Sequence, residues 1–330
     1  MPRAPHLLSM PWTRRQWLGG LLATSVGSAL AQSPGGRPLT LIVPFTAGGA
    51  SDIGARMLAP ELGKLLGQPV VVENLPGAGG ALAMQKLIRA EPDGHTLLYG
   101  GMSETLLVPM INPSVGYKPE DLQPVALAGS SPIVLAVRPD FPANNVDELV
   151  ALARRQPGKL SYGSAGIGSF AHVMGETIKE LTGIFMVHIP YRGGQQILTD
   201  VISGQIDVAV TTAANVAGMA AARRVKLLGV SAPARVEVIK DVPTFAESTA
   251  LKGVEMSVWA LMLTPRGTPA AVQERLSQAI NTALVLPALK AARVRLASDL
   301  PSLMSPAQAS AFLAREQARY RSVTSRIKPE

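Results

Sequence analysis

Short apolar runs alternate with amphipathic stretches along most of the chain after residue 38. In the first third, the apolar runs predict strands at 39–45, 69–74 and 95–101, and the amphipathic stretches predict helices at about 51–66 and 80–89. Farther on, strand patterns occur at LSYGS, MVHIPY, 206–210 and 227–231, and helical patterns at 146–155, 170–182 and 195–203. Strands that alternate with helices are typical of parallel sheets. The pattern therefore predicts an α/β protein.

Two long extended runs interrupt this alternation, at 131–143 and 254–265. A new series of strands and helices follows the first run, and a helical tail without partner strands follows the second. If that tail packs back on the first part of the chain, the chain crosses twice between two lobes. We therefore predict one lobe from 32–135 and 258–330 and another from 136–257. Ligands of open α/β sheets bind beyond the carboxyl ends of strands, so the lobes would face each other across a cleft.

Residues 1–31 have the pattern of a cleaved export signal. Arg14 and Arg15 precede an apolar run at 17–31 that ends in Ala-Leu-Ala. A membrane-spanning helix needs about 20 apolar residues, and this run is shorter. We therefore predict cleavage between Ala31 and Gln32 and a periplasmic location, with a retained membrane anchor as the alternative.

The export route and the start of translation stay open. The signal contains TRRQWL (13–18), which resembles a twin-arginine (Tat) motif except that Trp17 stands where Phe is usual. The Sec route is the alternative. Met10 is a second candidate start beside Met1, because it would give a signal of more ordinary length.

The composition is that of a globular protein with a mildly basic charge. Among 330 residues, 47% are hydrophobic and 4% aromatic, and the formal charge is +8. Loss of the three arginines of the signal lowers this charge to +5, which favours anionic solutes modestly. The chain has no basic stripe with interleaved aromatics, so its sequence does not indicate nucleic-acid binding. The chain has no Cys, so disulfides and thiol chemistry are excluded.

The first candidate binding loop is VPFTAGGASD (43–52), between a predicted strand and a predicted helix. A helix N-terminus presents free N–H groups and about half a positive charge, so it can bind a carboxylate or phosphate. A nucleotide phosphate loop would need a lysine directly after the glycines, and the next lysine is Lys64. A simple turn, with Ser51 or Asp52 capping the helix, is the structural alternative.

A second glycine loop, 162–173, follows the strand LSYGS. Its residues 166–171 match the dinucleotide pattern, but the next strand ends in Pro190 and Tyr191 instead of the acid that would hold a ribose. Anion binding by backbone N–H groups fits the loop better. Arg192 is a candidate counter-ion, with simple surface exposure as the alternative.

Catalytic patterns are sparse. No G-x-S-x-G or H-E-x-x-H motif occurs, and the four histidines are scattered, so we expect neither a metal site nor a cofactor. His172 follows the second glycine loop, and a structural role is the favoured interpretation over a catalytic one.

Eight stretches in this order resemble the Bug or TctC-like solute receptors, the extracytoplasmic subunits of tripartite tricarboxylate transporters. They are VPFTAGGASDIGAR, GQPVVVENLPGAGG, EPDGHTLLYG, PGKLSYGSAGIGS, MVHIPYRGG, LTDVISGQIDVAV, DVPTFAES and LTPRGTP. The resemblance implies an α/β, type II periplasmic-binding-protein fold, with two lobes, a central cleft and a hinge of two crossing strands. It implies binding without catalysis, with membrane subunits of a transporter as partners, and we expect a monomer.

The resemblance also implies where a ligand carboxylate binds, between the two glycine loops. Carried onto this chain, the ligand-binding residues are Phe45, Thr46, Ala47, Gly48, Gly49, Ser51 and Asp52 in the first loop, Ser164, Ala165, Gly166, Ile167, Gly168, Ser169 and His172 in and after the second, and Tyr191 nearby. Met102, Ser103 and Glu104 after the third strand, with Thr211 and Thr212, would face the other end of the ligand. A Gly168→Asp substitution is then expected to abolish binding.

The chain departs from the family pattern at two places. Ile167 stands where members often carry Asn, and Thr211-Thr212 stands where many carry Asp-Asn. Both changes remove polar side chains, so we expect a mono- or dicarboxylate with an apolar body, aromatic bodies included, and not an amino acid. A ligand sensor for a signalling pathway, and an NAD(P)-dependent enzyme that uses the 166–171 glycines, remain the alternatives.

Overall fold

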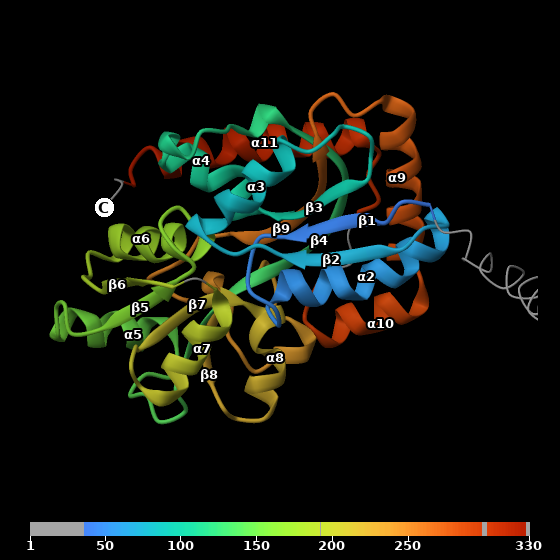
Figure 1. Cartoon of the computed structure of the whole chain (residues 1–330). Helices are drawn as coiled ribbons and strands as arrows, with labels where there is room; N and C mark the ends of the chain where they lie inside the picture. The colour runs from blue at the N-terminus through green and yellow to red at the C-terminus, as the bar shows by residue number, and fades with distance from the viewer. Residues whose placement is uncertain (1–35, 192, 299–301, 328–330) are drawn as a thin grey trace, which may run out of the picture. The chain divides into compact units, whose positions relative to one another are not determined.

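The computed structural model describes residues 36–191, 193–298 and 302–327. The predicted signal, its cleavage site and Arg192 lie outside the described residues. Arg37–Glu330 form a compact unit of their own, and the fold below is that of this unit (Figure 1). Within the described ranges, no helix combines the length and the apolar character that crossing a membrane requires.

The first sheet is built around β1 (Leu39–Val43), whose apolar side chains are almost all buried. β2 (Val70–Asn74) and β3 (Thr96–Gly101) lie parallel to it on either side. β9 (Ser257–Pro265) is antiparallel to β3, and the first part of β4 (Leu122–Val137) is antiparallel to β9. The parallel part confirms the alternation read from the sequence, and β9 comes from the far end of the chain.

The second sheet is built around the last part of β4. β7 (Val208–Thr212) and β8 (Lys226–Ser231) lie antiparallel on its two sides. Beyond β7 lie β5 (Ser161–Ser164) and then β6 (Val187–Pro190), all three parallel to one another. The carboxyl ends of β5 and β7 therefore lie at the same edge of the second sheet.

Two strands connect the sheets. β4 pairs with β9 as far as Pro132, opposite Ser257, and from Ile133 onward it pairs with β7 and β8. The chain returns to the first sheet through β9. This arrangement has the two crossing strands that the family resemblance implies, and Figure 1 shows β4 and β9 running together through the middle of the unit.

Helices cover both sheets and come from all parts of the chain. They are α2 (Ala50–Leu66), α3 (Ala81–Ile88), α4 (Val108–Ile111), α5 (Val146–Arg155), α6 (Phe170–Thr182), α7 (Gly194–Ser203), α8 (Ala213–Ala221), α9 (Ala270–Leu284), α10 (Pro287–Arg295) and α11 (Pro306–Thr324), with a π-helical turn, η2 (Ser103–Leu107). α9 packs on α2 and β4, and α11 packs along β4. The C-terminal tail thus buries its apolar face on the first sheet, although the predicted lobe boundaries themselves stay a prediction.

Three apolar clusters form the core. One joins β1, α2 and α9, a second joins the end of β4 with α7 and α8, and the largest runs from α3 and β3 to α6. In α7, Ile197, Leu198 and Val201 are buried, and Ile202 is half-buried. These clusters fix the strand ends from which the loops of the site project.

Candidate functional site

A cavity of about 90 Å³, here called the central cavity, lies where the two sheets meet. The N-terminal ends of α2, α6, α7 and α8 contribute to its wall. Nine of the predicted ligand-binding residues line it: Phe45, Thr46, Gly49, Ser51, Ser103, Glu104, Ala165, Thr211 and Thr212. Helix N-termini carry partial positive charge, so four of them at one cavity create a site that favours an anion.

The first glycine loop is held in shape by Asp52. Its carboxylate accepts the Gly48 N–H at 2.9 Å, an N–H of Arg56 at 2.9 Å and the Asn74 amide at 2.9 Å. Burial raises the pKa of Asp52, but the hydrogen bonds from Arg56, Gly48 and Asn74 outweigh it and hold the pKa below its usual value. The ionised Asp52 therefore braces the loop, and its side chain does not line the central cavity.

The polar side chains of the second glycine loop also bind within the protein. Ser164 Oγ lies 2.6 Å from His188 Nε2. Ser169 caps α6 by accepting the His172 N–H at 3.3 Å, and His172 Nδ1 accepts the Gly168 N–H at 3.2 Å. These contacts support the structural interpretation of His172. They fix the backbone of the loop next to the cavity.

Other predicted residues lie away from the central cavity. Gly166, Ile167 and Tyr191 line a separate cavity of about 300 Å³, together with Phe45 and Ala165. The Tyr191 hydroxyl donates to Asp200 at 2.7 Å. The residues that line neither cavity are Ala47, Gly48, Asp52, Met102, Ser164, Gly168, Ser169 and His172. The structure thus divides the predicted set into residues that face a cavity and residues that support its loops.

Glu104 brings a carboxyl group to the wall of the central cavity, where the family resemblance implies a ligand contact. It lies in η2, directly after β3, and is fully buried. One carboxyl oxygen accepts the Gly101 N–H, and within the described part of the chain Oε2 has no hydrogen-bond partner. Burial raises the pKa of Glu104 to about 7. A carboxyl group that titrates near neutral pH therefore lines a cavity suited to anions.

Asn215 is a cavity residue that the sequence reasoning missed. Its Oδ1 accepts the Ala50 N–H of α2 at 2.8 Å, and its amide donates to Thr211 Oγ1 at 3.1 Å. The available signal was its position in the first turn of α8, directly after Thr211 and Thr212 at the end of β7. The amide supplies polarity beside the threonines that stand where an Asp-Asn pair was expected.

Further hydrogen bonds cross between the loops of the two sheets. Gln195 in α7 donates to the Gly48 carbonyl at 2.7 Å, and the Phe170 N–H at the start of α6 donates to Ser103 Oγ at 2.9 Å. With the Ala50–Asn215 bond, they join the first sheet to α6, α7 and α8. In the part of the chain that the structure describes, no cluster of three His, Cys, Asp or Glu residues could hold a metal ion.

Comparison with known sequences places the chain in a family. Residues 54–328 match the family model described as TctC, the tripartite tricarboxylate transporter family receptor. The chain is 39% identical to a UPF0065 protein of Bordetella pertussis (strain Tohama I), over 81% of this chain and 82% of that protein. It is 32% identical to protein BugT of the same organism, over 95% and 97% of the two chains.

Solved structures agree with the sequence comparison. Periplasmic binding protein BugD has a TM-score of 0.83 and 31% identity, covering 88% of this chain and 97% of its own. MatC from Rhodopseudomonas palustris, with bound malate, has a TM-score of 0.83 and 30% identity, covering 87% and 99%. Rpa4515 from R. palustris, with adipate, has a TM-score of 0.84 and 28% identity, covering 89% and 99%.

The crossing strands, the cavity between the sheets and these similarities lead to one assignment. The fold is the type II periplasmic-binding-protein fold, with two α/β lobes, and its neighbours are substrate-binding proteins and not enzymes. The chain belongs to the TctC family, the solute-binding receptors of tripartite tricarboxylate transporters.

Proposed function

We propose that this receptor binds a small carboxylate in the central cavity and presents it to the membrane subunits of a tripartite tricarboxylate transporter. The observation that carries the proposal is the meeting of four helix N-termini at a cavity that, among the described residues, no Lys, Arg or His side chain lines. Backbone N–H groups can bind a carboxylate there without a basic side chain.

The lining of the cavity supports a ligand with an apolar body. Phe45, Phe170, Ile197, Val210 and Val258 are among the apolar side chains that line it. This lining favours a mono- or dicarboxylate with an apolar body, aromatic bodies included, over an amino acid, whose ammonium group would meet one acidic side chain, Glu104, among the described lining residues. Among the structural neighbours, MatC holds malate and Rpa4515 holds adipate, which are both carboxylates.

The proposed cycle begins with the lobes apart. The carboxylate binds the N–H groups of one lobe first, and the second lobe then closes over it. The bonds Ala50–Asn215, Gln195–Gly48 and Phe170–Ser103 form only when the lobes are together, so they stabilise the closed form with the ligand. The closed receptor is the form that docks on the membrane subunits.

Gly49 offers the sharpest test of the anion site. It precedes α2 with φ −79°, and a Cβ built there would meet its nearest neighbour, the Thr46 carbonyl oxygen, at 3.6 Å. Asp and Asn both cap helices well, so either fits at this position. Gly168 is less suitable, because its φ is +80° and an added Cβ would lie 3.0 Å from Val108 Cα.

The experiment compares Gly49→Asp with Gly49→Asn. Both variants have nearly the same shape, but only Asp adds a negative charge at the helix N-terminus. We expect the Asp variant to bind carboxylates at least about tenfold more weakly than the Asn variant, because like charges repel in a partly buried site. Calorimetric titration with malate and adipate measures this. Equal affinities in the two variants would contradict a carboxylate site at this loop.

The remaining expectations belong to the same proposal. The receptor is exported, by the Tat or the Sec route, and is cut between Ala31 and Gln32. It acts as a monomer, with lobes at 32–135 plus 258–330 and at 136–257. Use as a signalling sensor would require the same ligand site, and no contact among the described residues favours it over transport.

A further inference from the structure

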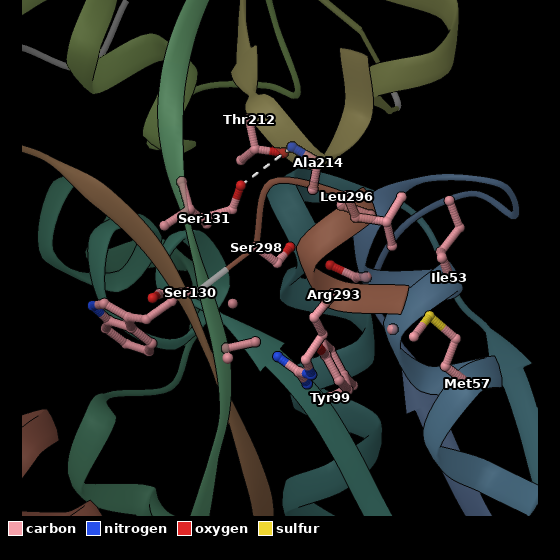
Figure 2. A pocket seen from close by; sticks show the side chains of 18 of the residues that line it. Ile53, Met57, Tyr99, Ser130, Ser131, Thr212, Ala214, Arg293, Leu296 and Ser298 are labelled. Carbon is pink, nitrogen blue, oxygen red and sulfur yellow. Dashed lines mark hydrogen bonds between the residues drawn. The ribbon is translucent and has the colours of Figure 1, made fainter. Parts of the chain in front are cut away.

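A second cavity of about 80 Å³ adjoins the central cavity (Figure 2). The two share the wall residues Ala50, Ser51, Gly101, Thr212 and Val258. Leu289 and Arg293 of α10, with Leu296 directly after the helix, line the second cavity. A ligand that extends past Ser51 and Thr212 would therefore arrive beside α10. This space is called the Arg293 cavity below.

Arg293 is a buried cation without an acid to pair with. Its side chain is 7% exposed, and one guanidinium nitrogen donates to the Ala128 carbonyl. In the ranges that the structure describes, Nε has no hydrogen-bond partner and no acid forms an ion pair with Arg293. A side chain at position 129 would clash with the guanidinium, so Gly129 leaves the space that Arg293 uses.

The surroundings of Arg293 suit the anionic end of a ligand. Figure 2 shows the Arg293 side chain reaching from α10 to Tyr99. Burial raises the pKa of Tyr99, so its hydroxyl stays protonated and can donate a hydrogen bond. At the junction of the two cavities, Thr212 Oγ1 is buried and has no partner among the described residues. Thr212 Oγ1, the Tyr99 hydroxyl and the Arg293 guanidinium are therefore three donors on residues that line the Arg293 cavity.

The energetic argument concerns the unpaired charge. A buried guanidinium without an acid is costly, because it loses water and gains only partial compensation from the Ala128 carbonyl and the Tyr99 hydroxyl. A carboxylate beside it would restore that energy through charge-assisted hydrogen bonds, which are about twice as strong as neutral ones. A binding protein can use this energy for its ligand, since the ligand then replaces the missing acid.

We infer that the Arg293 cavity binds a second carboxylate of the ligand, so that the physiological substrates of this receptor are extended dicarboxylates. This inference rests on the proposed function. The first carboxylate binds at the helix N-termini of the central cavity, the apolar body lies past Thr212, and the second carboxylate binds Arg293 and the Tyr99 hydroxyl.

The test compares diacids with their half-amides, in which an uncharged amide replaces the second carboxylate at nearly equal size. Succinate, adipate and suberate are titrated into the purified receptor beside the matching half-amides. For the diacid of suitable length, we expect binding at least about tenfold tighter than for its half-amide, as for a buried charge pair. No preference at any length would overturn the inference even without a variant.

Arg293→Met then identifies the group responsible. It keeps the apolar stem but removes the charge, and we expect the diacid and its half-amide to bind this variant within about threefold of each other. Arg295→Met, on the exposed face of the same helix, is the matched control and should keep the wild-type preference. A preference that survives Arg293→Met would overturn the inference and leave Arg293 as a structural contact to Ala128.

The half-amide also separates this inference from the proposed function. If the half-amide binds and the diacid has no advantage, the central cavity is a carboxylate site and only the Arg293 subsite is refuted. If neither compound binds at any length, the proposed function fails and the subsite fails with it. Retained binding of the half-amide by Arg293→Met further shows that the variant is folded.

Discussion

Glu104→Gln should make the receptor more stable above neutral pH. Glu104 is fully buried in the wall of the central cavity, and its Oε1 accepts the Gly101 N–H. Gln keeps an oxygen for that hydrogen bond but cannot ionise. The nearby Tyr117 hydroxyl donates to the Glu104 carbonyl at 2.6 Å, and burial raises its pKa, so it does not titrate in the same range.

The magnitude follows from the pKa. Burial raises the pKa of Glu104 from 4.5 to about 7, and each pKa unit corresponds to about 1.4 kcal/mol, so the total is about 3 kcal/mol. Between these two values the folded protein binds more protons than the unfolded chain, and stability falls as pH rises. The stability that protonated Glu104 contributes is fully present below pH 4.5 and is lost as pH rises past about 7. Above that pH the wild type carries the full cost of a buried carboxylate.

The assay is urea denaturation of both proteins over a range of pH, in the absence of ligand. We expect the difference in unfolding free energy between Glu104→Gln and the wild type to shift by about 3 kcal/mol in favour of the variant between pH 4.5 and pH 8. Glu237→Gln, at an exposed position, is the control and should follow the wild type. Parallel curves for Glu104→Gln and the wild type would refute a carboxyl group that titrates on burial.

Two further predictions concern the loops of the site. Asn215→Ala removes the acceptor of the Ala50 N–H. Because this hydrogen bond belongs to the closed form, we expect carboxylate affinity measured by calorimetry to fall about five- to tenfold. Unchanged affinity would show that the bond does not favour closure. Asp52→Asn should destabilise the protein by about 1–3 kcal/mol at pH 7. Because the pKa of Asp52 is lowered from 3.8, its contribution is present above that value and is lost as pH falls, so denaturation at pH 7 and pH 3 should show the penalty shrinking in acid. A penalty that stays constant would argue against an ionised Asp52.

The fold could be predicted because its strands are local apolar runs. LTLIV in β1 and the runs after it are short, buried and separated by helical stretches, so periodicity alone indicates the parallel sheets. The extent of β4 was not visible in this way. Pro124, Gly129 and Pro132 interrupt its pattern, and the strand continues because it gains β9 as a partner from far along the chain. The pattern of apolar residues within β4 does not reveal that it pairs with β9.

The site was predictable at the level of loops but less so for single side chains. A loop after a parallel strand projects toward the cleft whatever its residues are, so 43–52 could be placed. Asp52 and Ser164 resemble ligand-binding groups in sequence, but Asn74 and His188, from other strands, bind them in the structure. Conversely, Arg293 lies in a polar helix, whose composition predicts an exposed side chain. Its burial depends on Gly129 and on the packing of α10.

The backbone and the side chains divide the work of recognition in this receptor. Helix N-termini bind any carboxylate of suitable size, because they offer N–H groups and partial charge but little discrimination. The buried charges that lie at the two cavities are those of Glu104 and Arg293, and no salt bridge between described residues includes either of them. An ionised Glu104 would repel an anionic ligand, and Arg293 would attract its second charge. Under the two proposals above, the affinity for carboxylates as a class is therefore a property of the fold, whereas selection among carboxylates depends on these two side chains.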